Sequence, residues 1–551
     1  MVQKRKPKAG GQITLQKLNS LIYLLVMVGV FPLFFLNQYE KIGTLKFTLF
    51  WYSSLIFWGV GITISVIRGL KVVAGEGSYP NVISINGRRF YVLKLSFMDK
   101  AMIAYGICVI LSFSFSDYKE FALKGAVGWE MGLYTQLIFL GLYWILSRQR
   151  VSIKPVLAAH FVTSGLVFLL GILHRFDIDP LGFYQGLTIF QKQEFLSTIG
   201  QATWYSSYVC TVFVLGVLVF YFSERSRIQL GAGIYTVLSF ATLVTQNSDS
   251  AFLSIAAVML LLGCFSLSGG ERLVRFWQLM TFLWGTFGSM GILQRIFSDR
   301  MIPLDTLSLF FSQSMLTWIF FAASLVIYVV LEQAKKERME KLLPIFRMAC
   351  KGLWVILGAG VLLLIAFIYL NTKGYLLAWW GYQSTNPYLY FDYHWGNNRG
   401  LSWIVCWQQF WQLPFLHKLF GVGPDSFLPY LYSVPQVSEQ LKSFWGNLNL
   451  ANAHNEYLNH LLCYGLLGLG AWMTVLIGGI RYFYRKAKEE PYFIGVALCI
   501  LSYGCHNLFC YQQVCCTPFL FLLLGIAEGL TKREKSPTII KNNYNRKKKR
   551  K

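Results

Sequence analysis

The sequence predicts an all-α polytopic membrane protein with about 14 transmembrane helices. Three observations lead to this fold class. Of the 551 residues, 55% are hydrophobic and only 14% are charged, whereas soluble domains carry about 25% charged residues. The hydrophobic residues fall in repeated stretches of roughly 20, each long enough to cross a bilayer. Most Lys and Arg residues lie in the segments between these stretches and in the two tails.

The predicted spans follow from the length of each apolar stretch and from the charges at its ends. They are residues 20–36, 45–67, 99–116, 131–147, 155–172, 204–222, 229–246, 250–267, 276–292, 314–331, 353–370, 457–477, 492–509 and 514–530. An even number of spans puts both termini on one side of the membrane. Because most basic residues also fall on that side, the positive-inside rule makes it cytoplasmic. We therefore expect a single integral membrane domain over residues 1–551, with both termini in the cytoplasm.

Two cytoplasmic segments outside the spans carry predictions of their own. The runs Val82 to Ile85 and Phe90 to Leu95 flank Asn86-Gly87, a pair typical of a tight turn, so residues 68–97 are expected to hold a small hairpin. Residues 532–551 form a basic tail, which we expect to be disordered and attracted to anionic lipids.

The largest polar segment, residues 372–456, is predicted to be an extracytoplasmic loop with short amphipathic helices. Within it, Arg399, Trp403, Trp407 and Trp411 are four residues apart, so a helix aligns them along one face. A Trp stripe beside a span is typical of a helix in the bilayer interface, which would put Arg399 at the depth of the lipid phosphates. Four other outward loops are expected to converge with this one as walls of a single site: residues 117–130, 174–204, 246–250 and 506–513.

The distribution of charge narrows the function. The net charge of +25 is spread over the loops and tails, which indicates membrane topology and argues against nucleic-acid binding. The spans carry almost no charged residues, whereas ion-coupled transporters place acids or bases inside the membrane. The polar residues gather at the outer surface instead, which favours a reaction between a lipid-anchored group and an extracytoplasmic one. The 11 cysteines lie mostly within or near apolar spans and are interpreted as packing residues.

Arg399 and His454 are the first candidates for chemistry. A guanidinium donates paired hydrogen bonds to phosphate and keeps its charge, so Arg399 can stabilise a diphosphate as it leaves. An imidazole can accept the proton of a sugar hydroxyl or donate to phosphate, and both roles stay open for His454. The plain alternatives are an Arg that reaches for lipid head groups and a His that caps a span.

Further candidates are weaker. The turn from Gly421 to Asp425 can offer backbone N–H groups to an anion, although a plain turn has the same composition. Asp425, Asp392, Glu130 and Asp249 are alternative bases. Neither a metal ion nor a cofactor is expected.

Three motifs follow one another in residues 399–470. They are Arg399-Gly400 with Trp403 and Trp407, then Phe420-Gly421-Val422-Gly423-Pro424-Asp425-Ser426-Phe427, then Ala453-His454-Asn455-Glu456-Tyr457-Leu458 followed by Tyr464-Gly465-Leu466-Leu467-Gly468. In this order they resemble the O-antigen ligase/polymerase superfamily of bacterial membrane glycan transferases. Arg399 matches the loop Arg of that family, and His454 matches its loop His.

The resemblance implies a fold and a reaction. Such an enzyme has a GT-C-like fold, works at the outer face of the bacterial cytoplasmic (inner) membrane, and moves a glycan from undecaprenyl diphosphate to an acceptor hydroxyl on a glycan, a lipid or a protein. The transfer is expected to invert the anomeric carbon and to need no metal. Arg399 and His454 become the expected catalytic residues. The expected substrate-binding residues are Lys124, Lys192, Trp403, Gly423, Asp425, Asn455 and Glu456, the last two also orienting His454.

One position departs from the family pattern. Members often have Ser-Arg where this chain has Ser248-Asp249-Ser250. A second diphosphate-binding cation is thus unassigned, and Lys124, Arg175 and Lys192 are the possible substitutes. Ligase, polymerase and protein glycosyltransferase differ on the acceptor side, which these residues do not distinguish. Outside the family, the alternatives are a flippase or transporter for lipid-linked glycans and a structural membrane subunit.

Overall fold

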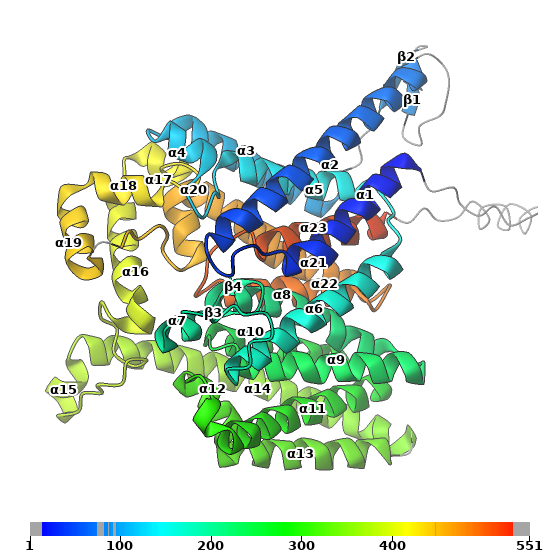
Figure 1. Ribbon diagram of the computed structural model, residues 1–551. Coiled ribbons are helices and arrows are strands. Elements are labelled where there is room, and N and C mark those ends of the chain that lie inside the picture. The colour runs from blue at the N-terminus through cyan, green and yellow to red at the C-terminus, as the bar shows by residue number, and fades with distance from the viewer. Residues whose placement is uncertain are drawn as a thin grey trace, which may run out of the picture.

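Long helices form one bundle and run roughly along a common direction (Figure 1). The computed structural model describes residues 14–73, 82–85, 88–91, 95–334, 336–446 and 448–532, so the predicted basic tail lies outside the described residues from 533 on. The helices of the bundle are α1 (Leu15–Leu25), α2 (Ile42–Val73), α3 (Phe97–Phe115), α5 (Leu133–Leu146), α6 (Ile153–Arg175), α8 (Ala202–Phe222), α9 (Ser226–Thr245), α10 (Ser250–Ser266), α11 (Gly270–Ile296), α13 (Met315–Glu332), α14 (Lys336–Thr372), α20 (Glu456–Met473), α21 (Gly479–Lys486), α22 (Phe493–His506) and α23 (Thr517–Thr531).

Many of these helices are long and apolar enough to cross a membrane. In the described chain, nine helical segments meet that condition, and four further apolar helices (α5, α10, α22 and α23) are shorter. Each predicted span overlaps a helix of the bundle, and α11 takes the span predicted over residues 276–292. The all-helical membrane architecture is therefore confirmed, whereas the count of about 14 spans and the GT-C-like fold stay predictions.

Short helices gather at one end of the bundle, the left end in Figure 1. The segment between α14 and α20 was expected to contain short helices, and its described part does. They are α15 (Tyr375–Trp380), α16 (Trp395–Gln412), α17 (Phe415–Phe420), α18 (Phe427–Ser433) and α19 (Pro435–Trp445). At the same end lie α4 (Lys119–Lys124), α7 (Ile189–Glu194) and α12 (Thr306–Gln313).

Strands are few in the described chain. At the opposite end of the bundle, β1 (Val82–Ile85) pairs antiparallel with β2 (Arg88–Tyr91), and Ile85 stands opposite Arg88. This confirms the predicted hairpin, with a second strand that begins at Arg88 rather than at Phe90. A smaller antiparallel pair, β3 (Phe195–Leu196) with β4 (Gly200–Gln201), leads into α8.

A kink in α20 connects this helix to the segment between α14 and α20. Gly465 has a φ of 69°, which glycine adopts without a steric cost, so the helical hydrogen bonds are interrupted there. The carbonyls of residues 462 and 463 accept instead the N–H groups of Val422 and Gly423, at 3.0 Å each. The kink thereby fastens the turn that precedes Asp425 onto a helix of the core.

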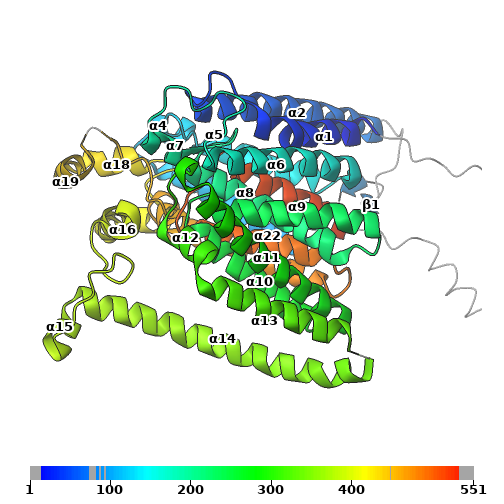
Figure 2. The same ribbon diagram turned by 60° about the horizontal axis from the view of Figure 1, so that its bottom comes forward.

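The helix α14 stands apart from the rest of the bundle (Figure 2). No residue of its most apolar window is buried, so in a membrane this helix presents its side chains to lipid. Hydrogen bonds nevertheless connect its C-terminal end to the segment that follows. The Asn371 side chain donates to the carbonyls of Ser384 (3.0 Å) and Leu389 (2.9 Å) and accepts the N–H of Ser384 (2.9 Å). These bonds fix the start of the segment that carries Arg399.

Candidate functional site

Arg399 begins the regular part of α16. The three residues before it, Gly396, Asn397 and Asn398, have φ angles of 60°, 60° and 65°, so the chain bends sharply there. Such a sparsely populated backbone persists only where the surrounding structure holds it, and it is common at functional sites. The guanidinium donates through Nη1 to the Gly396 carbonyl at 2.9 Å, while Nε is buried without a hydrogen-bond partner among the described residues. Arg399 therefore keeps donor groups for a ligand.

His454 lies in a tight turn just before α20. Its φ is 49°, and its backbone N–H donates to Oδ1 of Asn452 at 2.9 Å. The imidazole meets the Tyr511 ring edge to face, with 5.4 Å between ring centroids. Burial, followed by the positive charge of Arg399, lowers the pKa of His454 to about 3. The imidazole is therefore neutral at neutral pH.

Two contacts between α16 and the start of α20 bring Arg399 and His454 together. The Ser402 hydroxyl lies within hydrogen-bonding distance of the carbonyls of Arg399 (2.8 Å) and Ala453 (3.1 Å). One turn later, Sγ of Cys406 donates to the Leu458 carbonyl at 3.3 Å. Because Arg399 lowers the pKa of His454, the two side chains are also electrostatically coupled. The two expected catalytic residues thus share one site.

Two carboxyl groups lie within electrostatic range of Arg399. Asp249, which precedes α10, accepts the Tyr388 hydroxyl through Oδ2 at 3.0 Å, while its buried Oδ1 has no partner in the described chain. Burial raises the pKa of Asp249, and both the Tyr388 hydrogen bond and the Arg399 charge oppose that rise. For Asp305, burial and then the charge of Asp249 raise the pKa. The surroundings of Arg399 are therefore acidic rather than basic.

Four further loops, which the sequence predicts to face outward, converge on this region. Trp129 from the first loop meets Tyr511 from the last at 4.9 Å between centroids. Trp204, at the end of the second loop, donates to the Tyr511 hydroxyl at 3.2 Å. Asp249 from the third loop binds Tyr388 of the large loop. Tyr511 therefore contacts the first two loops, through Trp129 and Trp204, as well as His454 of the large loop.

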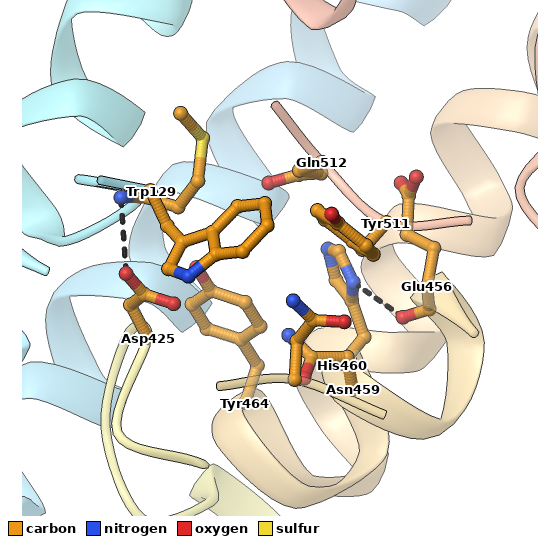
Figure 3. Close-up of a pocket in the computed structure, with 10 residues that line it drawn as sticks. Trp129, Asp425, Glu456, Asn459, His460, Tyr464, Tyr511 and Gln512 are labelled. Carbon is orange, nitrogen blue, oxygen red and sulfur yellow. Dashed lines mark hydrogen bonds between the residues drawn. The ribbon is translucent and has the colours of Figure 1, made fainter. Parts of the chain in front are cut away.

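A pocket opens beside His454, and Tyr511 forms part of its wall. The empty space between its walls is about 360 Å³ when the part open to solvent is included. The lining side chains come from residues 129–131, 425, 452–464 and 511–512 (Figure 3). The sequence indicated the 506–513 loop as a wall but did not single out Tyr511. The available signal was the run of residues 511–513, which is polar although it lies between two apolar spans.

A comparison with protein families gives the class of this site. A family model described as O-Antigen ligase matches residues 301–473. This part of the chain is therefore similar to the O-antigen ligase/polymerase superfamily, in agreement with the resemblance of its motifs. The matched segment runs from just before α12 to the end of α20 and includes both Arg399 and His454. No curated protein matches the chain.

This match supports a glycosyltransferase-like membrane enzyme of O-antigen-type glycan biosynthesis, with a lipid-linked glycan donor and a glycan acceptor. Where the pattern of O-antigen ligases often has an Arg, this chain places Asp249 beside Arg399. The departure seen in the sequence therefore changes the charge of the site itself.

The Trp stripe that the four-residue spacing predicted divides in two. Trp407 and Trp411 are 50% and 56% exposed, as expected for side chains that anchor a helix at the membrane surface. Trp403 instead turns inward and packs on Trp395 (5.0 Å between centroids) and Phe509 (5.8 Å). Its role as a substrate-binding residue stays a prediction.

Gly423 and Asp425 connect their turn to α20 and to the loop before α5. The N–H of Gly423 already donates to the carbonyl of Cys463, which leaves it no N–H for an anion. Oδ2 of Asp425 accepts the N–H groups of Ala126 (2.8 Å) and Met131 (3.1 Å), and burial raises the pKa of Asp425 to about 7. Asp425 also lines the pocket, so it connects the turn, the first outward loop and the cavity.

Asn455 and Glu456 support the turn that carries His454. Asn455 caps α20, because its Oδ1 accepts the N–H of Leu458 at 2.9 Å. Glu456 is 1% exposed, and its Oε2 accepts from the Tyr503 hydroxyl (3.0 Å) and from the Asn507 amide. Both residues therefore position the backbone on which His454 sits, and a direct contact with substrate stays a prediction.

The three cations that could replace the missing second Arg have other partners. Lys124 is exposed and pairs with Glu120 at 3.5 Å, and Lys192 pairs with Asp177 at 2.7 Å. Arg175 is buried and donates to the backbone carbonyls of Thr245, Gln246 and Gln193. Among them, Arg175 has a structural role, and a second phosphate-binding cation stays unassigned.

Proposed function

We propose that this protein transfers a glycan from a polyprenyl diphosphate carrier to an acceptor hydroxyl at the extracytoplasmic face of the bacterial inner membrane. The observation that supports this function is the pairing of Arg399, which has an unpaired guanidinium nitrogen, with an electrically neutral His454. When a hydroxyl displaces diphosphate, one group has to stabilise the leaving anion and another has to accept the hydroxyl proton.

Arg399 acts on the leaving group. As the bond between the anomeric carbon and the phosphate oxygen breaks, its electron pair goes to the diphosphate, and the guanidinium stabilises the added negative charge. Because the diphosphate leaves as a stabilised anion, no general acid has to protonate it. The buried setting of Arg399 strengthens this interaction, since water screens it less than at an open surface.

His454 acts on the nucleophile. The acceptor oxygen forms its bond to the anomeric carbon from the face opposite the diphosphate, with inversion, and its proton passes to the imidazole. A pKa of about 3 in the free protein makes a weak base. A bound diphosphate offsets the charge of Arg399, and the nearby anion raises the pKa of the imidazole when the donor is in place. Proton transfer is thereby favoured only with the donor bound. The reaction is proposed to need no metal ion.

Variants of the two residues test this function. We expect Arg399→Ala and His454→Ala each to lower transfer at least about a hundredfold, because each removes a group that acts in the transition state. The assay uses purified full-length protein in detergent with a lipid-linked glycan donor and an acceptor, and it measures the joined product. Product formed without a sealed membrane also excludes transport as the sole role.

The matched control is Arg300→Ala, an exposed Arg in the short helix that follows α11, which we expect to keep wild-type transfer. Arg399→Lys retains the charge but loses the paired donors, so it should fall between wild type and Arg399→Ala. Near-normal transfer by Arg399→Ala or His454→Ala in protein that folds normally would refute the assigned role.

The same chemistry serves a polymerase, whose acceptor is a second lipid-linked glycan, and a ligase, whose acceptor is another envelope molecule. Deletion of the gene separates the two classes. Loss of a polymerase leaves single repeat units, whereas loss of a ligase leaves complete chains on their lipid carrier.

A further inference from the structure

The helix α14 is attached to its neighbours at two places along its length. Nearer its N-terminus, Sγ of Cys350 lies 3.0 Å from Sγ of Cys264 at the end of α10, and the Trp354 indole N–H donates to the same Cys264 sulfur at 3.0 Å. At its C-terminal end, the Asn371 side chain binds the backbone of the segment that follows. From Trp354 to Asn371 the helix extends roughly 26 Å.

Between these attachments, α14 is not packed against the bundle. Every residue from Val355 to Ala366 is exposed apart from Leu357, which is half-buried. Because about 3.6 residues complete one helical turn, these residues cover all sides of the helix, so the side that faces the bundle is uncovered as well. Figure 2 shows α14 lying apart from the other long helices.

The contact with Cys264 identifies the side of α14 that faces the bundle. Residues at steps of three or four lie on one helix face, and the face that carries Cys350 and Trp354 continues through Val361 and Leu364. These last two side chains are 56% and 48% exposed. They therefore point toward the bundle without being covered by it.

The helix α10 turns one uncovered face toward α14. By the same spacing, Cys264 shares its face with Leu260, Ala257 and Leu253. None of the four is buried, and Leu253 is 39% exposed, whereas Val258 on another face is fully buried. Since Cys264 meets α14, the exposed Leu253 lies on the side of α10 that faces α14.

A short segment joins the outer ends of the two helices. Oγ1 of Thr372, the last residue of α14, accepts the N–H of Phe391 at 2.9 Å. Three residues earlier, Tyr388 donates its hydroxyl to Asp249, which directly precedes α10, at 3.0 Å. The two helices, this segment and the contact at Cys264 therefore surround an opening, which we call the window.

The sides of the window are uncharged, and charged groups lie at its outer edge. Residues 250–264 of α10 and 354–370 of α14 contain no Asp, Glu, Lys, Arg or His. At the outer edge, Asp249 lies within electrostatic range of Arg399. The height of the window, roughly 26 Å, is close to the hydrocarbon thickness of a bilayer, about 30 Å. Such an opening suits a lipid with a long hydrocarbon chain and an anionic head group.

We propose that the window holds the isoprenoid chain of the carrier lipid while Arg399 binds its diphosphate. The proposal rests on the transfer reaction above and gives the path of the donor through the membrane. A chain joined to the diphosphate has to run into the hydrocarbon layer, because apolar surface is driven out of water. Held between α10 and α14, the chain fixes the direction from which the first sugar meets the acceptor hydroxyl.

A photoreactive carrier tests the window without the transfer reaction. The probe is a polyprenyl phosphate with a benzophenone group in its chain, added to the full-length protein in nanodiscs of phosphatidylglycerol and phosphatidylethanolamine. After irradiation, we expect mass spectrometry to find the label within residues 253–264 and 354–368. Excess undecaprenyl phosphate should remove this labelling, whereas extra phosphatidylglycerol should not.

Two variants of α14 form a matched pair. Val361→Trp fills space on the side that faces α10, so labelling within the window should fall about tenfold. Leu363 is 70% exposed and lies on the opposite face of the same helix, so Leu363→Trp adds the same side chain toward lipid. Leu363→Trp should be labelled like wild type.

Transfer from donors of two chain lengths links the window to the reaction. We expect Val361→Trp to raise the KM for the undecaprenyl-linked donor about tenfold. The farnesyl-linked donor is too short to fill the window, so its transfer by Val361→Trp should match wild type, which also shows that the variant folds.

The proposal is overturned if phosphatidylglycerol competes as well as undecaprenyl phosphate, because ordinary lipid would then fill the window. Labelling of Val361→Trp at the wild-type level would overturn it too, as would an equal effect of this variant on both donors. If the transfer reaction itself were wrongly assigned, neither donor would give product with wild type, while the labelling would still report on the window.

Discussion

At the scale of single residues, burial and then the charge of Arg399 decide which of two roles is open to His454. A protonated imidazole could have been a second positive donor to phosphate. Burial and the neighbouring guanidinium keep it neutral instead, which favours proton acceptance. Asp249 adds a carboxyl group within electrostatic range of Arg399, so anion binding at this site depends on one guanidinium whose charge nearby acids oppose.

Asp425 gives a pH-dependent prediction. Its pKa in the folded protein is raised to about 7, whereas an unfolded Asp titrates near about 3.9. The group therefore favours the folded state fully below about pH 4 and loses this contribution as pH rises through about 7. We expect the thermal midpoint of wild type to fall between pH 5 and pH 8 by more than that of Asp425→Asn, measured side by side in the same detergent.

The amide of Asp425→Asn still accepts the two backbone N–H groups but does not ionise. As a comparison, Asp425→Ala leaves both N–H groups without a partner, at a cost of about 1–3 kcal/mol each, and should be less stable at every pH. Parallel pH profiles for wild type and Asp425→Asn would show that the carboxyl does not titrate in this range.

Part of the candidate site could be predicted from the sequence. The other contacts could not be predicted, because they join residues that are far apart along the chain. Arg399 and His454 belong to ordered motifs within one segment, so their pairing could be anticipated. The partner of Asp425 at Ala126 is 299 residues away, and only the fold reveals that this carboxyl binds backbone. Tyr388 and Asp305 carry no local motif at all.

At the scale of the elements, the kink of α20 gives a sharp prediction. Gly465 has a positive φ, and a Cβ there would collide with the backbone of residues 419–420. Gly465→Ala should therefore lower the amount of folded protein and its thermal midpoint, and transfer should fall with it because the turn before Asp425 is displaced. Fluorescence-detected size-exclusion chromatography measures both the amount and the midpoint.

The matched variant is Gly470→Ala in the same helix. A Cβ at Gly470 meets no atom within 4 Å, and Ala has the higher helix propensity, so this variant should be as stable as wild type or slightly more stable. Equal behaviour of the two variants would mean that the kink does not depend on glycine.

The helices were easier to predict than the kink and the bend that interrupt them. Apolar length alone located a helix at each predicted span, because in lipid the backbone has to satisfy its own hydrogen bonds. The kink at Gly465 and the bend before Arg399 could not be predicted, because they depend on carbonyls and turns that meet only after the helices pack.

At the scale of the whole molecule, the membrane orientation is open to direct test. The start of α8 contacts Tyr511 beside the site, and its 21 residues extend roughly 31 Å to the opposite end of the bundle. We expect a membrane-impermeant maleimide to label Ser443→Cys on α19 in intact cells, and to label Ser226→Cys only after permeabilisation. Both residues are exposed.

The wild-type protein serves as the control for background labelling, because its described cysteines are free and mostly buried. Labelling of Ser443→Cys only after permeabilisation would put the site in the cytoplasm and remove its access to an outward-facing donor. The helical fold class followed from composition, while the orientation rests on the positive-inside rule alone.

The bond from Ser402 to Ala453 has a consequence for biogenesis. The ribosome delivers Arg399 well before His454, and the two meet only when α20 has entered the membrane and the intervening segment has docked on it. A nascent chain caught midway carries the guanidinium without its imidazole, so the proposed site is complete only after α20 and the segment before it have come together.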